Sequence, residues 1–290
     1  MMPTITIQPV SRVRRSAFVR AVNAAYEGYY VPIVLTPHSF GELVRRESVE
    51  LSRSAAALDG GRVVGLGLLG VRGAHGWIGG MGVIPAYRRQ GIARRVMKYL
   101  IGQGVDAGLR RLQLEVIVEN SGAYHLYESL GFQVERQLHV LVREEGPSPP
   151  APNGTGLIVK PAAVGRLLAR LPALAGTPRP WQREAESIYA LGRDLRGVAA
   201  FREGTQAPVG VCFYHAERYH VGLVDVAADT LEAGSALLAH LLAEFPLARI
   251  TYLNIAEDDP LFPLLRGLGF RSTLSQHEMT LPLNQEQPDR

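Results

Sequence analysis

The stretch from Val83 to Ala93 has the residue types that bind phosphate groups. Pro85 ends a strand because it cannot donate to a sheet, and a tight loop then enters a helix that begins near Gly91. The first amides of a helix lack partners within it and lie at the positive end of its dipole, where anions bind. The segment therefore predicts a pyrophosphate loop; the alternative is an arginine-rich helix start in which Gly91 relieves crowding. The arginines that add charge are Arg88, Arg89, Arg94 and Arg95.

These residues resemble the acetyl-coenzyme A loop of the GNAT acetyltransferase superfamily. The family pattern is Arg/Gln-x-x-Gly-x-Gly/Ala after a strand ending in Val-x-Pro, and here it stands as Arg88-Arg89-Gln90-Gly91-Ile92-Ala93. A second family signature follows at the right distance, and two segments in the right order make the resemblance specific. It covers residues 1 to about 145 well and the second half of the chain only in outline. The second signature comprises Leu114-Glu115-Val116, Asn120, Ala123, Leu126-Tyr127-Glu128 and Leu130-Gly131-Phe132.

The resemblance implies acetyl-CoA as the cofactor and a backbone gap that holds it. In GNAT proteins a bulge splits two neighbouring strands, and the pantetheine arm lies in the gap. The run from Gly79 to Gly82 is where the bulge would sit, because glycine suits a bulge and a close approach; a loose edge strand is the alternative. The cofactor-binding residues implied are Met81, Gly82, Val83, Arg88, Arg89, Gln90, Gly91, Ile92, Ala93, Arg94, Asn120, Ala123 and Tyr127.

The implied reaction is direct attack of a primary amine on the thioester of acetyl-CoA. The amine, with a pKa near ~10, must lose a proton, and the departing thiolate, whose thiol has a pKa of about 8.5, needs one. Tyr127 matches the family tyrosine that faces the coenzyme sulfur and is the predicted acid. Glu115, twelve residues earlier, is similarly placed to the base of ribosomal-protein alanine N-acetyltransferases, which acts through water. Amides near Met81–Val83 are the predicted oxyanion donors.

Each of these side chains also has a structural interpretation. Tyr127 is spaced from Ala123 and Leu130 as a core-facing helical residue would be. Glu115 alternates with apolar neighbours, which does not reveal the face that meets the cleft, so a solvated or structural glutamate stays open. Asn120 resembles the asparagine that bonds the coenzyme arm, and it can also cap the following helix.

The segment from Tyr26 to Pro32 occupies the place of the acceptor-binding loop in GNAT proteins. Its tyrosines and its acid would suit an amine with apolar surroundings, so we expect a small-molecule or peptide amine as the acceptor. Loop aromatics are also common packing residues. The predicted acceptor-binding residues are Tyr26, Glu27, Tyr29 and Tyr30.

The elements that must position these residues alternate between strands and helices. Their order favours an α/β (α+β) fold, in which a mixed, mostly antiparallel twisted sheet is flanked by helices. Strands are predicted over residues 4–9, 54–58, 62–70, 77–83, 111–118, 132–137 and 139–143, and helices over 14–25, 39–47, 91–102 and 121–130.

The chain reads as two copies of one domain. A proline- and glycine-rich run over 146–156 is typical of an interdomain linker. Leu130-Gly131-Phe132 recurs as Leu268-Gly269-Phe270, and Val64-Gly65 recurs as Val209-Gly210, at offsets of 138 and 145. Matches in the same order favour duplication. We therefore expect a catalytic domain over 1–145, a GNAT-like domain over 157–284 and a polar tail over 285–290.

The second copy looks degenerate. Aligning Val83 with Val226 puts Gly234 and Ala236 at the small positions of the anion loop, with no arginine and with Glu232 beside them. Aligning the Leu-Gly-Phe turns puts Leu265 where Tyr127 stands. We expect this domain to keep the fold without the coenzyme, and to pack on the first domain, wall the acceptor cleft or form a homodimer.

Composition excludes several other classes. The 290 residues are 47% hydrophobic and 20% charged, as in a globular protein, and no apolar run is long enough to span a membrane. One cysteine, Cys212, forbids an internal disulfide and a multi-cysteine zinc site. No nucleophile elbow or Walker loop occurs, and the start of the chain carries no secretion signal, so we expect a cytoplasmic protein.

The function predicted is N-acetyl transfer from acetyl-CoA to a primary amine. The alternative is a non-catalytic acyl-CoA-binding sensor or interaction module. Nucleic-acid binding through the clustered arginines is a third and weaker hypothesis, because the net charge is only +4.

Overall fold

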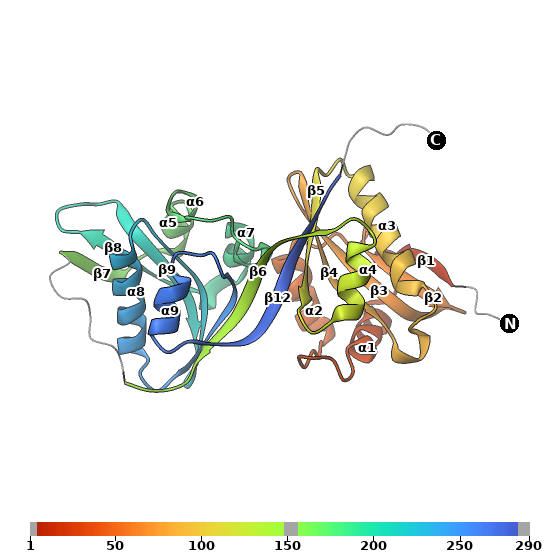
Figure 1. The fold of residues 1–290 in the computed structure, drawn as a ribbon, viewed down its shortest axis with the longest axis horizontal. Helices are drawn as coiled ribbons and strands as arrows, with labels where there is room; N and C mark the ends of the chain where they lie inside the picture. The colour runs from red at the N-terminus through yellow and green to blue at the C-terminus, as the bar shows by residue number, and fades with distance from the viewer. Residues whose placement is uncertain (1–4, 148–155, 284–290) are drawn as a thin grey trace. The chain divides into compact units, whose positions relative to one another are not determined.

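The structure, a computed structural model, describes residues 5–147 and 156–283 (Figure 1). The described residues form two compact units, each with its own hydrophobic core. The first unit contains residues 5–135 and 277–283, and the second contains 136–147 and 156–276. Most of the predicted linker, residues 148–155, and the predicted tail, 285–290, lie outside the described residues.

In the first unit, helices flank a mostly antiparallel sheet, as the sequence predicts. The sheet order is β1-β2-β3-β4-β5-β12, where β12 covers Arg271–Pro282, and β4 and β5 are parallel while β1 to β4 are antiparallel. Helix α2 begins at the Thr36 capping box with Pro37 in its first turn, which fixes its start. The elements are β1 (Thr6–Pro9), α1 (Arg15–Ala25), α2 (Pro37–Arg46), β2 (Ala55–Asp59), β3 (Arg62–Arg72), β4 (His75–Val83), α3 (Ile92–Asp106), β5 (Arg111–Ile117) and α4 (Ser121–Glu128).

Two faces of this sheet carry different helices. A Cβ added at Gly67 would meet Val96 and Leu100 of α3, and one added at Gly82 would meet Ala25 of α1. Helix α3 therefore packs on one face and α1 on the other. The main core cluster lies on the α3 face, and it includes residues of β5 and of β12 (Arg271–Pro282).

The end of the first half is one strand and not the two predicted strands. Strands were expected over 132–137 and 139–143, but β6 (Gln133–Arg143) runs without interruption. The physical reason is that Leu138 is fully buried and no turn-forming residue stands beside it. Strand β6 begins in the first unit and continues into the second, while β12 begins in the second and ends in the first. The division therefore differs from the expected boundaries at 145 and 157.

The second unit repeats the architecture of the first. Strands β7 to β10 are antiparallel in sequence order, and β10 and β11 are parallel, as β4 and β5 are. The repeated Leu-Gly-Phe turns both contain a left-handed glycine, Gly131 and Gly269, which supports duplication. The elements are β7 (Leu157–Pro161), α5 (Val164–Leu168), α6 (Leu171–Leu174), α7 (Ala185–Ala190), β8 (Arg196–Arg202), β9 (Pro208–Ala216), β10 (His220–Ala228), α8 (Leu231–Glu244), β11 (Arg249–Ala256) and α9 (Phe262–Gly267).

Replacing Met279 by alanine should destabilise the first unit, although this residue lies near the end of the chain. Met279 is 1% exposed within the first unit's core cluster, and truncation of such a side chain costs about 2–5 kcal/mol. Hydrogen exchange of β5 amides should accelerate while β9 amides keep their protection. Arg271→Ala, on the exposed beginning of β12, is the matched control. Equal loss of protection in both units would contradict the assignment.

Candidate functional site

A bulge in β4 ends its pairing with β5. Leu66 pairs with Gly82 and Leu68 with Gly79, so Gly80 and Met81 of β4 together face a single residue of β3. Gly80 has a φ of 60°, which favours glycine. The parallel pairing of β4 with β5 stops at Trp77 and Gln113. The predicted bulge is confirmed, and the backbone groups beyond it are not used in a β4–β5 ladder.

The loop after β4 leads to a helix start without a side-chain cap. A 3₁₀ turn over Pro85–Tyr87 is followed by two left-handed residues, Arg89 and Gly91, with φ values of 62° and 76°. The first helical hydrogen bond of α3 is the one from the Arg95 amide to the Gly91 carbonyl. The amides of the first helical turn therefore have no acceptor within the helix. This geometry suits an anion, as the sequence predicts.

The arginines of this loop do different things. Arg88 donates to the carbonyls of Val83 and Ala25, at 3.1 and 3.0 Å, so it ties β4 to the C-terminal end of α1. Arg94 donates to the Ser129 hydroxyl at 2.7 Å. Arg89 and Gln90 are exposed in the loop. Arg88 therefore has a structural role, holding β4 and α1 together, that the sequence did not reveal.

Tyr127 is buried on α4, facing the core cluster on the α3 side of the sheet. Burial and the neighbouring Tyr29 raise the pKa of its phenol, so the hydroxyl keeps its proton at neutral pH. The phenol can therefore donate a proton but cannot act as a base at neutral pH. The core-facing reading of Tyr127 is confirmed, and it is compatible with a role as acid because both require a protonated, desolvated phenol.

Asn120 connects α4 to the segment from Tyr26 to Pro32, which we call the tyrosine segment. Its side-chain oxygen accepts from the Ala123 amide at 3.3 Å, which confirms the predicted helix cap. Its side-chain nitrogen lies 3.4 Å from the Tyr29 hydroxyl. Burial raises the pKa of Tyr29, although the Asn120 hydrogen bond works against this shift.

Glu115 lies on the face of β5 opposite to the α3 core. Its neighbours Leu112, Leu114 and Val116 belong to that core, so Glu115 points the other way, toward the α1 side. The Trp77 indole nitrogen donates to the Glu115 carboxylate at 2.7 Å. Glu115 stands two residues beyond the last β4–β5 pair, beside the point where the strands part. Trp77 was not predicted as a site residue, and the sequence alone holds no signal for it.

Three tyrosines of the predicted acceptor segment approach the same region. The Tyr26 hydroxyl donates to the carbonyl of Met81 in the bulge at 3.1 Å, and the Tyr30 hydroxyl donates to the carbonyl of Glu119 at 3.0 Å. Their rings pack edge to face through Tyr29, with centroids 5.0 and 5.2 Å apart. Glu27 is exposed in this segment. The structure thus brings the tyrosines to the bulge and to the end of β5.

Comparison with known proteins agrees with this geometry. Residues 21–132 match the family model described as Acetyltransferase (GNAT) family. The chain is also 46% identical over 50 residues to the [Ribosomal protein bS18]-alanine N-acetyltransferase of Escherichia coli (strain K12). That match covers 17% of this chain and 34% of the relative, so the chain spans about a third of the length of the curated relatives it matches.

Solved structures share the fold of the whole chain. A tandem GNAT protein from the clavulanic acid biosynthesis pathway aligns with a TM-score of 0.68 and 15% identity, over 96% of this chain and 98% of that one. A GCN5-related N-acetyltransferase from Sphaerobacter thermophilus aligns with a TM-score of 0.70 and 13% identity, over 97% of each chain. The chain thus has the fold of two GNAT-like domains in tandem.

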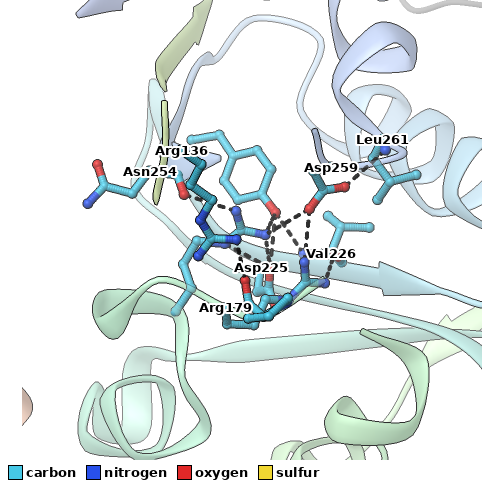
Figure 2. A network of polar contacts seen from close by, with 10 residues as sticks. Arg136, Arg179, Asp225, Val226, Asn254, Asp259 and Leu261 are labelled. Carbon is cyan, nitrogen blue, oxygen red and sulfur yellow. Dashed lines mark hydrogen bonds and ion pairs between the residues drawn. The ribbon is translucent and has the colours of Figure 1, made fainter. Parts of the chain in front are cut away.

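The second GNAT-like unit keeps the parting strands but fills the space between them. Strand β10 has a bulge between Leu223 and Asp225, and its pairing with β11 stops at Leu223 and Tyr252. A buried ion network lies beyond that point (Figure 2). Asp225 accepts from the Tyr252 hydroxyl at 3.0 Å and from Arg183, whose guanidinium lies 4.5 Å from the Tyr252 ring centroid.

A second arginine extends this network toward α8. Arg179 pairs with Asp225 at 3.1 Å and with Asp259 at 2.9 Å, and both carboxylates are buried. Next to Arg179 and Asp259, a cavity of about 210 Å³ reaches the end of β10 and Thr230 at the start of α8. These side chains occupy the position that corresponds to the backbone gap of the first unit.

The anion loop itself is missing from the second unit. Only Asp229 and Thr230 join β10 to α8, whereas residues 84–91 join β4 to α3. The Thr230 hydroxyl accepts from the Ala233 amide at 3.2 Å, so α8 caps its own start. Gly234 and Ala236 lie inside α8, which corrects their predicted alignment with Gly91 and Ala93.

The second unit also lacks a tyrosine at the position that corresponds to Tyr127. The Phe132 amide donates to the Tyr127 carbonyl, and the Phe270 amide donates to the Leu265 carbonyl, each at 3.1 Å. Leu265 therefore occupies the position of Tyr127, as the sequence predicts.

Neither a metal centre nor a membrane helix is found in the part of the chain that the structure describes. Within residues 5–147 and 156–283, histidine, cysteine and acidic side chains form no group of three that could hold a metal ion. Cys212 is fully buried. None of the described helices is both long and apolar enough to cross a bilayer.

Gly91→Ala should lower both stability and CoA affinity. A Cβ at Gly91 meets no atom within 4 Å, so the cost comes from its φ of 76° and is about 1 kcal/mol. The added methyl would also project into the space expected for the phosphates. Gly102→Ala is the matched control, because Gly102 lies inside α3 with open space and an ordinary φ, and alanine there should stabilise by up to about 1 kcal/mol. Calorimetry with CoA and thermal unfolding measure both effects; equal affinities for the two variants would contradict the anion loop.

Asp225→Ala should destabilise the second unit by about 3–5 kcal/mol, because it leaves Arg179 and Arg183 buried without their shared carboxylate. Denaturant unfolding followed by hydrogen exchange of β9 and β10 measures the effect. The control is Asp229→Ala, which removes an exposed carboxylate 4.0 Å from Arg202 and should change stability little. Similar small losses of stability for both variants would show that the buried ion network does not stabilise the second unit.

Proposed function

We propose that the first unit transfers an acetyl group from acetyl-CoA to a primary amine, either of a small molecule or of a protein N-terminus. The observation that carries this proposal is the bulge at Gly80 and Met81, which parts β4 from β5 between an uncapped helix start and a buried tyrosine. The GNAT family match over residues 21–132 supports it.

The residues present fit the cofactor. The amides at the start of α3 and the charge of Arg89 and Arg94 suit a pyrophosphate. The backbone of Met81 to Val83 has no β5 partner and suits the amide groups of a pantetheine arm. Bound there, acetyl-CoA supplies an acetyl group activated as a thioester.

The chain's own residues then handle charge and protons. Glu115 takes the proton that the attacking amine loses, directly or through a water molecule, and Trp77 holds its carboxylate in place. Backbone amides near Met81–Val83 stabilise the oxyanion as the new C–N bond forms. As the C–S bond breaks, the Tyr127 hydroxyl gives its proton to the departing sulfur. Burial raises the pKa of Tyr127, and the same dry surroundings raise the basicity of the thiolate, so the sulfur can take the proton and leave Tyr127 as a phenolate.

The tyrosine segment supports an acceptor with an aromatic or apolar group beside its amine. The aromatic rings of three tyrosines pack edge to face near the end of β5. They are Tyr26, Tyr29 and Tyr30. The curated relative that matches over 50 residues is named for an alanine of a ribosomal protein, so a peptide with N-terminal alanine is the first acceptor to try.

Tyr127→Phe should lower kcat by about 10²-fold while CoA binding is retained, because the phenyl ring keeps the packing and loses the proton. Thiol release from acetyl-CoA over a panel of amines measures the rate, and calorimetry measures binding. Tyr124→Phe, three residues earlier on α4, is the control and should stay active. The raised pKa of Tyr127 also predicts no alkaline loss of activity from this group below pH ~10, since the phenol stays protonated there. CoA binding without thiol release for any amine would favour the non-catalytic sensor instead.

A further inference from the structure

Gly79 of β4 lies beneath the indole ring of Trp77. The atoms nearest to a Cβ added at Gly79 would be three ring carbons of Trp77, Cζ2, Cζ3 and Cη2, all closer than real Cβ contacts come. The backbone at Gly79 is not left-handed, whereas that of Gly80 has a φ of 60°. The conformation of the chain therefore does not require glycine at position 79. The ring requires it, because the ring lies where a side chain would be.

This ring and Glu115 lie on the same face of the sheet. Ile78 packs into the core cluster on the α3 side, and side chains alternate along a strand, so Trp77 and Gly79 point to the α1 side. Glu115 of β5 also points to that side. The indole nitrogen of Trp77 donates to its carboxylate at 2.7 Å. A ring that lies across β4 at Gly79 therefore reaches the neighbouring strand where the pairing of the two strands ends.

A side chain at position 79 would break this hydrogen bond. An indole is planar and rigid, so the ring cannot bend around an added methyl group and has to rotate as a whole about its two side-chain torsions. The rotation carries the indole nitrogen away from Glu115, because the nitrogen belongs to the same ring system as the overlapped carbons. Trp77 is only 8% exposed, so the rotated ring would also lose buried contacts.

We infer that Gly79 is a positioning residue for the general base, because its lack of a side chain lets Trp77 lie across β4 and orient Glu115. The inference rests on the proposed acetyl transfer and adds to it a residue that acts through its neighbours. A carboxylate held in one orientation is ready to take the proton of the attacking amine, whereas a misplacement of about 1 Å can cost about 10²-fold in rate.

The test uses the full-length chain with Gly79→Ala, which adds one methyl group under the ring. Thiol release from acetyl-CoA is measured with three amine probes, which are a peptide with N-terminal alanine, spermidine and glucosamine. We expect kcat to fall about tenfold, since a hydrogen bond to a charged group is lost, while the KM for acetyl-CoA stays unchanged. Trp77→Phe, which keeps a ring but removes the N–H, should show the same loss.

A double-mutant cycle connects the effect to the ring. When Gly79→Ala is added to Trp77→Phe, kcat should fall no further, because the N–H is already absent. Gly76→Ala is the matched control on the same strand, since its Cβ would meet Leu109 and Leu112 on the α3 side. It should lower the melting temperature and leave kcat as in the wild type.

Fluorescence reports on the ring without any turnover. The chain has two tryptophans, and Trp181 is fully buried in the second unit, so a change in quenching by acrylamide reports on Trp77. Quenching should increase in Gly79→Ala, because the displaced ring becomes accessible, and should stay as in the wild type in Gly76→Ala. Wild-type quenching in Gly79→Ala would overturn the inference.

The outcomes separate this inference from the proposed function. Wild-type kcat in Gly79→Ala, or an equal further loss in the Trp77→Phe background, overturns the inference and leaves acetyl transfer standing. A wild type that turns over none of the probes overturns the proposed function, and the inference falls with it. If Gly79→Ala shows no cooperative melt, Trp77→Leu carries the test. Adding Gly79→Ala to Trp77→Leu should not lower the melting temperature, because the ring is gone, and a lower melting temperature overturns the inference.

Discussion

Strands β4 and β5 pair only as far as Trp77 and Gln113, because two residues of β4 face one residue of β3. This mismatch turns the rest of β4 away from its parallel neighbour and leaves backbone groups without ladder partners. Gly80 makes it feasible, since its φ of 60° is strained for other residues. Every candidate functional feature of the first unit lies along this parting. The uncapped start of α3 lies beyond its far end, the tyrosine segment bonds to the bulge carbonyl, and Glu115 stands where the pairing stops.

The second unit has the same parting, but a buried ion network lies beside it. The bulge in β10 is kept, but beyond the last β10–β11 pair Asp225 accepts hydrogen bonds from Arg183 and from the Tyr252 hydroxyl. A buried carboxylate is costly without partners, and Asp225 pairs with two arginines and accepts a hydrogen bond from the Tyr252 hydroxyl. Thr230 satisfies the start of α8 in place of an anion. The fold is thus preserved while the features that would bind the coenzyme are replaced by internal contacts.

Each compact unit contains a strand segment from the other half of the sequence, so the units do not coincide with the two halves. Strand β6 leaves the first unit and ends in the core of the second, where Leu141 is fully buried. Strand β12 makes the opposite passage and brings Met279 into the first core. The first unit therefore depends on residues separated by more than 140 positions in the sequence. A break placed at the proline-rich run would remove the strand that lies beside Glu115.

The sequence by itself determined the family signature, the bulge, the helix start at Gly91, the cap at Asn120 and the loss of Tyr127 in the second copy. These are local features, set by glycine, proline and capping residues within a few positions of one another, so their types and spacing suffice to predict them. Only the tertiary structure decided three hydrogen bonds between distant segments. Trp77 donates to Glu115, Arg88 donates to the carbonyl of Ala25 at the end of α1, and Arg183 donates to Asp225 inside the second unit. The tertiary structure also decided that β12 lies next to β5. Each of these depends on which distant segments pair, and strand pairing is set by the burial of side chains across the whole chain, which neighbouring residues do not encode.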